Sequence, residues 1–158
     1  MKIEDNFLQN FVFEFIYNRF LHKHFAWYHQ HSKVGLDDGN IQFTHLFYDK
    51  ETKLSDKIDL LKPIFEKLKV KKLLRAKVNL TLKEDIIRPF DYHVDVDYTQ
   101  GKTAILYMNT NNGKTLFENG EEVDSIANRI VIFENSLNHT GTTHTDEKYR
   151  IVLNINYK

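Results

Sequence analysis

The segment Asp91-Tyr92-His93-Val94-Asp95 places an imidazole and a carboxylate two residues apart. Positions two apart on an extended chain point to the same face, so His93 and Asp95 can present their side chains together. This pair is half of a metal site. Asp97 continues the same face and is a rival for the carboxylate role. Because the chain has 8 His and abundant Asp, a single His-x-Asp pair is weak evidence of metal binding.

A second histidine from a distant strand would complete the site, and His139 in Asn138-His139-Thr140-Gly141 is the candidate. Two imidazoles and one carboxylate leave three positions of the metal open, which lets iron(II) bind a chelating co-substrate and dioxygen together. His144 competes for the same role. It is followed by Thr145-Asp146-Glu147, which is typical of a solvated turn, so we favour His139.

The last predicted strand, 149–157, carries a cation on its polar face. Arg150 shares that face with Val152, Asn154 and Asn156, whereas the opposite face is apolar. A guanidinium fixed on a strand is well suited to bind a carboxylate through two parallel hydrogen bonds. Arg150 is therefore a candidate for binding a carboxylate co-substrate.

In this order, the motifs resemble those of the iron(II)- and 2-oxoglutarate-dependent oxygenases, in the prolyl 4-hydroxylase-like branch. The resemblance covers roughly residues 71–158, and it is carried by His93-x-Asp95, the strands 102–109 and 128–133, His139-x-Gly141 and Arg150. It implies a double-stranded β-helix, or jelly roll, in which His93, Asp95 and His139 bind iron. It also implies that Arg150 holds the distal carboxylate of 2-oxoglutarate.

The resemblance implies a reaction as well. Dioxygen and 2-oxoglutarate are consumed, a substrate C–H bond is hydroxylated, and succinate and carbon dioxide are released, with ascorbate as an external reductant. Related halogenases have Gly or Ala where this chain has Asp95, so hydroxylation is the expected outcome. The branch suggests a peptidyl proline or another protein side chain as substrate, and small molecules stay open as alternatives.

Two further positions follow from the resemblance. Family members often place a hydrogen-bonding residue for 2-oxoglutarate on the strand before His-x-Asp, where this chain has Asn79, and a tyrosine on the strand after it, where this chain has Tyr107. Alternation alone does not say which face of the Tyr107 strand looks inward. Branch members commonly carry Lys at the position of Arg150. Residues 1–70 contain no motif of the family.

Two other functions remain open from the sequence. The chain could be a jelly-roll binding module that keeps the fold without oxygenase chemistry, or a cupin-like zinc or manganese enzyme. Arg150 distinguishes an oxygenase from a binding module, because a module that does not bind 2-oxoglutarate would not need this arginine.

The candidate site residues need strands to position them, and the sequence shows the alternation of apolar and polar residues that is typical of strands. Residues 74–82 alternate between apolar side chains and Arg75, Lys77, Asn79 and Thr81, and further strand-like runs follow at 102–109, 128–134 and 149–157. Turn-forming segments at 111–113 and 118–120 separate them. Earlier in the chain, 41–47 alternates as a strand. We expect rim loops that select the substrate at 32–40, 83–90 and 109–119.

Helices are expected in the first half. Apolar residues recur at helical spacing from Asn6 to His24, and Ser55 can cap a second helix that Pro63 should kink or divide. Lys67, Lys69, Lys71 and Lys72, with Arg75, are expected to form a solvated helix end. The predicted fold is thus mainly β, a jelly roll buttressed by two or three helices. We expect one domain over 1–158, with a helical support region and first strand in 1–70 and the jelly-roll core in 71–158.

Composition sets the remaining limits. The 158 residues include 22 Lys+Arg and 22 Asp+Glu, so the formal net charge is zero and no nucleic-acid partner is expected. No Cys is present, which excludes thiolate metal sites and cysteine nucleophiles and restricts a metal to imidazole and oxygen ligands. No apolar run approaches the length of a membrane span, and the N-terminus is acidic, so a cytoplasmic location is expected. The oligomeric state is left open.

Overall fold

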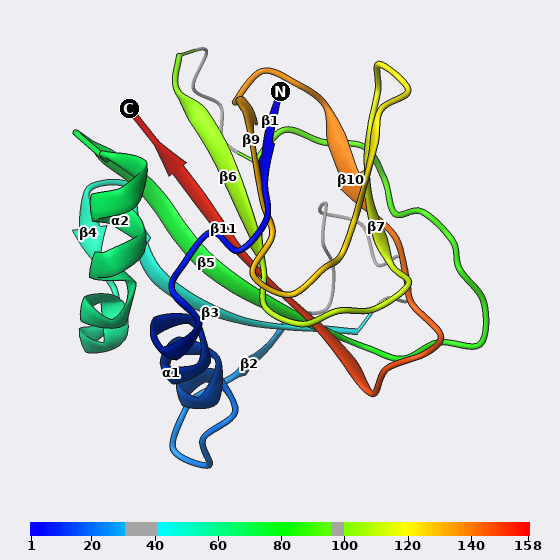
Figure 1. Cartoon of the computed structure of the whole chain (residues 1–158), viewed down its shortest axis with the longest axis horizontal. Coiled ribbons are helices and arrows are strands. Elements are labelled where there is room, and N and C mark those ends of the chain that lie inside the picture. Colours follow the sequence, from blue (N-terminus) through cyan, green and yellow to red (C-terminus); the bar gives the residue numbers. More distant parts are fainter. Residues whose placement is uncertain (31–40, 96–99) are drawn as a thin grey trace.

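The computed structural model describes residues 1–30, 41–95 and 100–158. Within these ranges, two antiparallel sheets face each other and helices cover the outer face of the larger one (Figure 1). The large sheet has the order β1-β9-β6-β11-β5-β3-β2, with β4 pairing to β3, and the small sheet has the order β10-β7-β8. The mainly β jelly-roll fold predicted from the sequence is confirmed.

The strands vary greatly in length, and the longest ones form the centre of the large sheet. Its strands are β1 (Lys2–Glu4), β2 (Tyr28–Gln30), β3 (Gln42–Asp49), β4 (Thr52–Lys53), β5 (Leu73–Leu82), β6 (Lys102–Tyr107), β9 (Ile130–Glu134) and β11 (Tyr149–Tyr157). The small sheet contains β7 (Lys114–Phe117), β8 (Glu122–Asp124) and β10 (His139–Gly141). The long central strands β5 and β11 pair along nearly their whole length.

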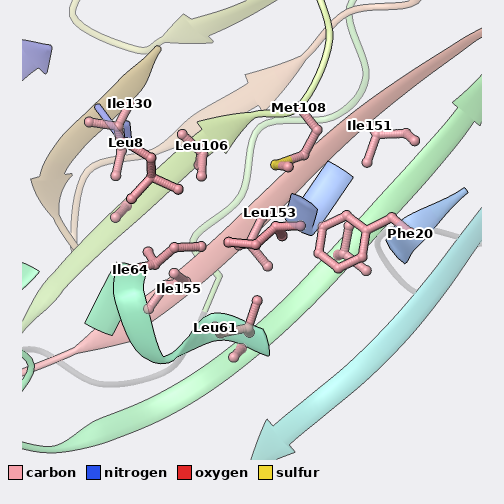
Figure 2. Packing of buried hydrophobic residues seen from close by; sticks show 14 of the residues in the cluster. Leu8, Phe20, Leu61, Ile64, Leu106, Met108, Ile130, Ile151, Leu153 and Ile155 are labelled. Carbon is pink, nitrogen blue, oxygen red and sulfur yellow. The ribbon is translucent and has the colours of Figure 1, made fainter. Parts of the chain in front are cut away.

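Two helical segments pack on the outer face of the large sheet. They are α1 (Asn10–Phe20) and α2 (Lys62–Leu68), and a 3₁₀ helix over Asp56–Leu61 precedes α2. Figure 2 shows Phe20, Leu61 and Ile64 from these segments against Leu153 and Ile155 of β11. This cluster forms the main core. No helix in the described ranges is long and apolar enough to cross a membrane.

The opposite face of the large sheet looks toward the small sheet and is mixed in character. Apolar residues of both sheets form a second, smaller cluster there, which includes Ile105, Phe117 and Val152. Beside it, β5 and β11 place polar side chains in the same space. The alternation of these two strands thus sends one set of residues to the main core and the other to the space between the sheets.

Several predicted elements agree with the structure. Strands β5, β6, β9 and β11 lie where the alternating runs predicted them, and Ser55 caps the 3₁₀ helix by accepting a hydrogen bond from the Lys57 amide. Pro63 lies at the start of α2, so the predicted division at this proline is confirmed.

Other predictions of local structure were wrong. Residues 1–70 contribute four strands and not one, and strand β7 lies inside the segment 109–119 that was expected to be a loop. Arg75 does not belong to a solvated helix end, because it lies in β5 and donates a hydrogen bond to the Asp95 carbonyl. The expected loop at 32–40 lies outside the described residues.

The first helix is also shorter than predicted, since it begins at Asn10 and ends at Phe20. Asn128 holds the residues that precede this helix. The Asn128 side chain accepts a hydrogen bond from the Leu8 amide at 2.9 Å and donates one to the Leu8 carbonyl at 2.8 Å. The backbone carbonyl of Asn128 accepts a hydrogen bond from the Phe7 amide. These bonds hold residues 7 and 8 in a non-helical path, so the helix begins only at Asn10.

Asn128 also has a positive φ of 61°, which Asn and Gly tolerate better than Ala. We therefore expect Asn128→Ala to lower the free energy of unfolding by about 2–4 kcal/mol, through two lost buried hydrogen bonds and a strained backbone. Asn128→Gly should lose roughly 1 kcal/mol less, because only the hydrogen bonds are lost. Denaturant unfolding measures both, with Asn18→Ala on the exposed face of α1 as control. Equal losses for the Ala and Gly variants would contradict the account.

Candidate metal centre

The structure brings His93, Asp95 and His139 together in the space between the two sheets. Their potential ligand atoms all lie within 4.8 Å of one another. His93 Nε2 is 3.7 Å from Asp95 Oδ1, and His139 Nε2 is 3.8 Å from Asp95 Oδ2. The carboxylate therefore lies between the two imidazoles, each of which presents its Nε2 atom.

Backbone pairing places the two histidines. The amide of each donates to the carbonyl of the other at 3.0 Å, which adds the segment around His93 to the edge of β10. Each ring is then oriented by a local carbonyl: His93 Nδ1 lies 3.1 Å from the Asp91 oxygen, and His139 Nδ1 lies 3.2 Å from the Leu137 oxygen. A proton on Nδ1 satisfies these contacts and leaves the lone pair on Nε2, the form that binds a metal.

The electrostatics of the three groups suit a cation. Burial opposes the charge of Asp95, but the two nearby histidines hold the pKa of this carboxyl well below its usual range. Burial lowers the pKa of His139, and the facing carboxylate raises the pKa of His93. At neutral pH, Asp95 is therefore ionised and His139 is neutral, as metal ligands must be.

A second set of polar side chains supports Asp95. Arg75 Nη1 donates to the Asp95 carbonyl at 2.8 Å, and the Nδ2 groups of Asn154 and Asn156 each lie 3.4 Å from Asp95 Oδ2. Asn156 also donates to Thr103 at 2.9 Å. The sequence put Asn154 and Asn156 on the same face as Arg150, but it gave no sign that they contact the carboxylate.

Arg150 lies in the same cavity as the three candidate ligands. It is 5% exposed, and its Nε donates to Ser125 Oγ at 2.9 Å while one terminal nitrogen donates to the Lys114 carbonyl at 3.4 Å. Within the described ranges no carboxylate forms an ion pair with it. Burial lowers its pKa, but an arginine starts so high that it stays charged. A buried guanidinium of this kind calls for an anionic ligand.

Two glycines lie beside this arginine. A Cβ at Gly113 would lie 3.0 Å from Arg150 Cδ and 2.9 Å from Asn111 Oδ1, and one at Gly141 would lie 3.4 Å from Arg150 Nη1. The first spacing is too short for an ordinary contact. Gly113 therefore has a packing reason, whereas a Cβ at Gly141 would make only ordinary contacts with the guanidinium and with Phe90.

Asn79 and Tyr107 both face the space between the sheets, but they differ in what they offer a ligand. Asn79 lines the cavity, and its Oδ1 is buried without a hydrogen-bond partner. Tyr107 is fully buried outside the cavity wall, where its hydroxyl donates to Thr115 at 2.7 Å and its ring lies 5.8 Å from the Arg150 guanidinium carbon. Burial raises the pKa of Tyr107 to about 12, so the hydroxyl keeps its proton.

Sequence reasoning missed several residues of the cavity wall. Thr81 pairs in register with Arg150, and its buried hydroxyl has no partner; Lys77 pairs with Asn154; and Thr115 lies beside Tyr107. The signal for Lys77 and Thr81 was present, because both share a face of β5 with Asn79. The rival His144 is buried outside the group of candidate ligands. The rival Asp97 lies outside the described residues.

This donor set fits a divalent metal of the first transition row. Two neutral imidazoles and one carboxylate on one side of an ion leave the other side open, the arrangement found in non-haem iron(II) oxygenases. Asn79, Thr81 and Arg150 line the same cavity and supply hydrogen-bonding groups there.

The comparisons with known proteins agree with the fold. The chain resembles the structure of a Pseudomonas putida prolyl-4-hydroxylase, with 14% identity over 99% of this chain and 91% of that chain and a TM-score of 0.58. It also resembles a Trichoplax adhaerens prolyl hydroxylase in complex with a hypoxia-inducible-factor peptide fragment, with 12% identity over 99% and 82% of the two chains and a TM-score of 0.69. No protein-family model and no curated protein matches the sequence.

Other neighbours show that this fold carries different chemistries. A third structure is the non-haem α-ketoglutarate-dependent epimerase SnoN, with 13% identity over 99% and 76% of the chains and a TM-score of 0.69. The dimethylsulfoniopropionate lyase DddQ from Ruegeria pomeroyi also matches, with 10% identity over 84% and 56% of the chains and a TM-score of 0.53. At these identities the likeness establishes the fold, and the activity must be argued from the site.

Removal of the carboxylate should abolish the metal site. We expect Asp95→Ala to eliminate stoichiometric Mn(II) binding measured by calorimetry under argon, because two neutral imidazoles remain. Asp91→Ala is the matched control, since the side chain of Asp91 is exposed and only its backbone carbonyl contacts His93. Retention of wild-type affinity by Asp95→Ala would show that the three residues do not form the site.

The amide side chain of Asn156, which contacts Asp95, should also affect the affinity for Mn(II). Asn156→Leu removes the amide that contacts both Asp95 and Thr103, and loss of such an outer contact weakens metal binding by about 10- to 100-fold. The same titration measures this, with Asn18→Leu as control for a surface change. An unchanged affinity in a folded Asn156→Leu variant would show that this contact does not orient the ligand.

Proposed function

We propose that the protein is an iron(II)- and 2-oxoglutarate-dependent dioxygenase that hydroxylates a C–H bond. The observation that supports this most strongly is the combination in one cavity of the His93, Asp95 and His139 group with a buried Arg150 that pairs with no carboxylate of the described residues. The likeness to 2-oxoglutarate oxygenases of known structure agrees with this combination.

In this proposal, each residue has a physical task. His93, Asp95 and His139 hold iron(II), and Arg150 binds the distal carboxylate of 2-oxoglutarate. Thr81 and Asn79 offer their unpartnered polar atoms along the same wall. Tyr107 supports Arg150 through its ring and its bond to Thr115.

The bound iron would supply the activation of dioxygen, with one oxygen atom going to the substrate and the other to succinate as carbon dioxide leaves. The chain's contribution is to orient the co-substrate and to exclude water. Phe133 packs edge-on against the His139 ring at 4.8 Å, and Phe90 lines the cavity beside Gly141, so the ligands lie against apolar walls.

For the substrate, we propose a peptidyl proline or another exposed group of a peptide, with a small molecule as the alternative. Exposed apolar residues support a docking surface for a peptide next to the site: Ile86, Ile87, Tyr92 and Val94 all lie on the segment that leads to Asp95. One structural neighbour is a prolyl hydroxylase that was solved with a peptide fragment.

A metal enzyme without 2-oxoglutarate is the second candidate, since a lyase shares the fold. A cupin-like zinc or manganese enzyme would need only the three metal ligands. A binding module would need only the fold. Neither would need Arg150, which therefore discriminates among the candidates.

The proposal predicts that purified protein with iron(II), ascorbate and 2-oxoglutarate forms succinate, slowly even without substrate. Arg150→Met should weaken 2-oxoglutarate binding by at least about tenfold while sparing Mn(II) binding, because it removes charge-assisted hydrogen bonds only at the far carboxylate. Arg150→Lys keeps the charge and should retain part of the affinity. Arg19→Met, which removes an exposed arginine on α1, is the control.

Two results would overturn the proposal. One is a wild-type protein that binds Mn(II) but not 2-oxoglutarate. The other is an Arg150→Met variant with unchanged affinity for the co-substrate.

A further inference from the structure

The cavity contains a second cation, the half-buried Lys77, which has no role in the proposed binding of metal or 2-oxoglutarate. It lies on β5 and faces the three candidate ligands from the wall of the large sheet. It makes no hydrogen bond or ion pair with any residue that the structure describes. Asp95 and Asp49 attract it only from a distance.

A half-buried lysine without an ion-pair partner is costly to the protein. Burial, with a smaller contribution from the nearby Arg75, lowers the pKa of Lys77 to about 8, so the ammonium is still charged at neutral pH. Long charged side chains normally reach solvent or a counter-ion. Lys77 is only partly exposed and has no counter-ion within the described ranges, and such an arrangement is typical of a residue kept for a ligand.

The position of Lys77 separates it from the co-substrate end of the cavity. Arg150 is the register partner of Thr81, whereas Lys77 is the register partner of Asn154, four residues along each strand. Four residues of a strand span roughly 13 Å. Asn154 contacts Asp95, so Lys77 is level with the candidate metal ligands and not with the site of the distal carboxylate.

Asn154 adds a second unpartnered group at this end. Its Nδ2 points to Asp95, but its Oδ1 is buried without a hydrogen-bond partner. A donor on Lys77 and an acceptor on Asn154 therefore stand side by side on neighbouring strands. Together they offer a binding place for a group that carries negative charge and is adjacent to an N–H or O–H.

The net charge of the cavity also favours binding of an additional anion. Among the described lining residues, Lys77 and Arg150 are positive and Asp95 is negative. A divalent ion and the dianion of 2-oxoglutarate would cancel each other, which leaves one positive charge enclosed with the reactants. An uncompensated charge in a buried site is unfavourable, and one further anion would neutralise it.

We propose that Lys77 binds a carboxylate of the primary substrate, and thereby selects substrates that carry an acidic group close to the C–H bond to be hydroxylated. This inference rests on the proposed function. The carboxylate has two possible sources, a free acid or an acidic side chain of a peptide, and the chemistry of recognition is the same for both.

Matched acid and amide probes test the inference on protein loaded with Mn(II) and 2-oxoglutarate under argon. One pair is N-acetyl-L-proline and its amide, and the other is the capped peptide acetyl-Ala-Pro-Glu-Ala-amide and its Gln counterpart. Calorimetry should show that the wild type prefers at least one acid over its neutral partner. Preference in the first pair identifies a free acid, and preference in the second identifies an acidic side chain.

Lys77→Met and Lys77→Gln should lose this preference by about 10- to 100-fold, the range expected when one charge-assisted hydrogen bond is removed. Lys77→Arg should retain part of it. Lys71→Met, which removes an exposed lysine, should behave as the wild type. Affinity for 2-oxoglutarate should change little in every variant, so a failure of the proposed function, seen as no 2-oxoglutarate binding by the wild type, is distinguished from a failure of this inference.

Three results would overturn the inference. The wild type shows no preference for any acid over its amide; the Lys77 variants keep the preference; or the Lys77 variants lose 2-oxoglutarate as strongly as Arg150→Met does. Thermal unfolding adds a check, because removal of an unpartnered, half-buried charge should raise the melting temperature of the ligand-free Lys77→Met variant. A lower melting temperature would identify a structural role for Lys77 instead.

Discussion

The site depends on one pair of backbone hydrogen bonds, those that join His93 to His139. They bring together two segments that are 46 positions apart in the sequence and fix the two imidazoles at the edge of the small sheet. The rest of the arrangement then follows from strand geometry. Asp95 lies two residues beyond His93, between both rings, and β11 runs behind it with Asn154, Asn156 and Arg150 on one face.

The two faces of the large sheet have different roles: the outer face stabilises the fold, and the inner face lines the cavity. The outer face is apolar, is covered by α1 and α2, and contributes most of the burial that stabilises a chain of this size. The inner face contains polar atoms that the protein itself leaves without partners, on Asn79, Thr81 and Asn154. Buried polar groups are nearly always hydrogen-bonded, so a group of exceptions in one cavity marks a place for a ligand.

Much of this could be predicted from the sequence, because the strongest patterns belong to the elements that carry the site. Strands β5 and β11 alternate over nine or more residues, which fixed both their extent and the face of Arg150. Short strands were missed, since three residues such as Lys2–Glu4 or His139–Gly141 are too few to show a period. The early helix was predicted too long because its first residues are tied to Asn128, a contact across 120 positions that local periodicity does not reveal.

Some residues of the site could likewise be predicted from the sequence, and others could not. The His-x-Asp spacing and the order of motifs indicated His93, Asp95, His139 and Arg150, and the structure brings all four into one cavity. Arg75, Lys77 and Asn156 were missed, since a charged or amide residue on an alternating strand is as often solvated as buried. Only the sheet order, which places β5 and β11 side by side opposite the small sheet, shows that these residues face inward.

The central claim is that the cavity binds 2-oxoglutarate through both the metal and Arg150. Calorimetric titration of 2-oxoglutarate and of glutarate, which lacks the keto oxygen, into protein with and without Mn(II) tests it most directly. We expect stoichiometric binding of 2-oxoglutarate that requires the metal, and much weaker binding of glutarate, because only 2-oxoglutarate can chelate the metal. Equal binding of both acids, or binding of 2-oxoglutarate that does not depend on Mn(II), would contradict it.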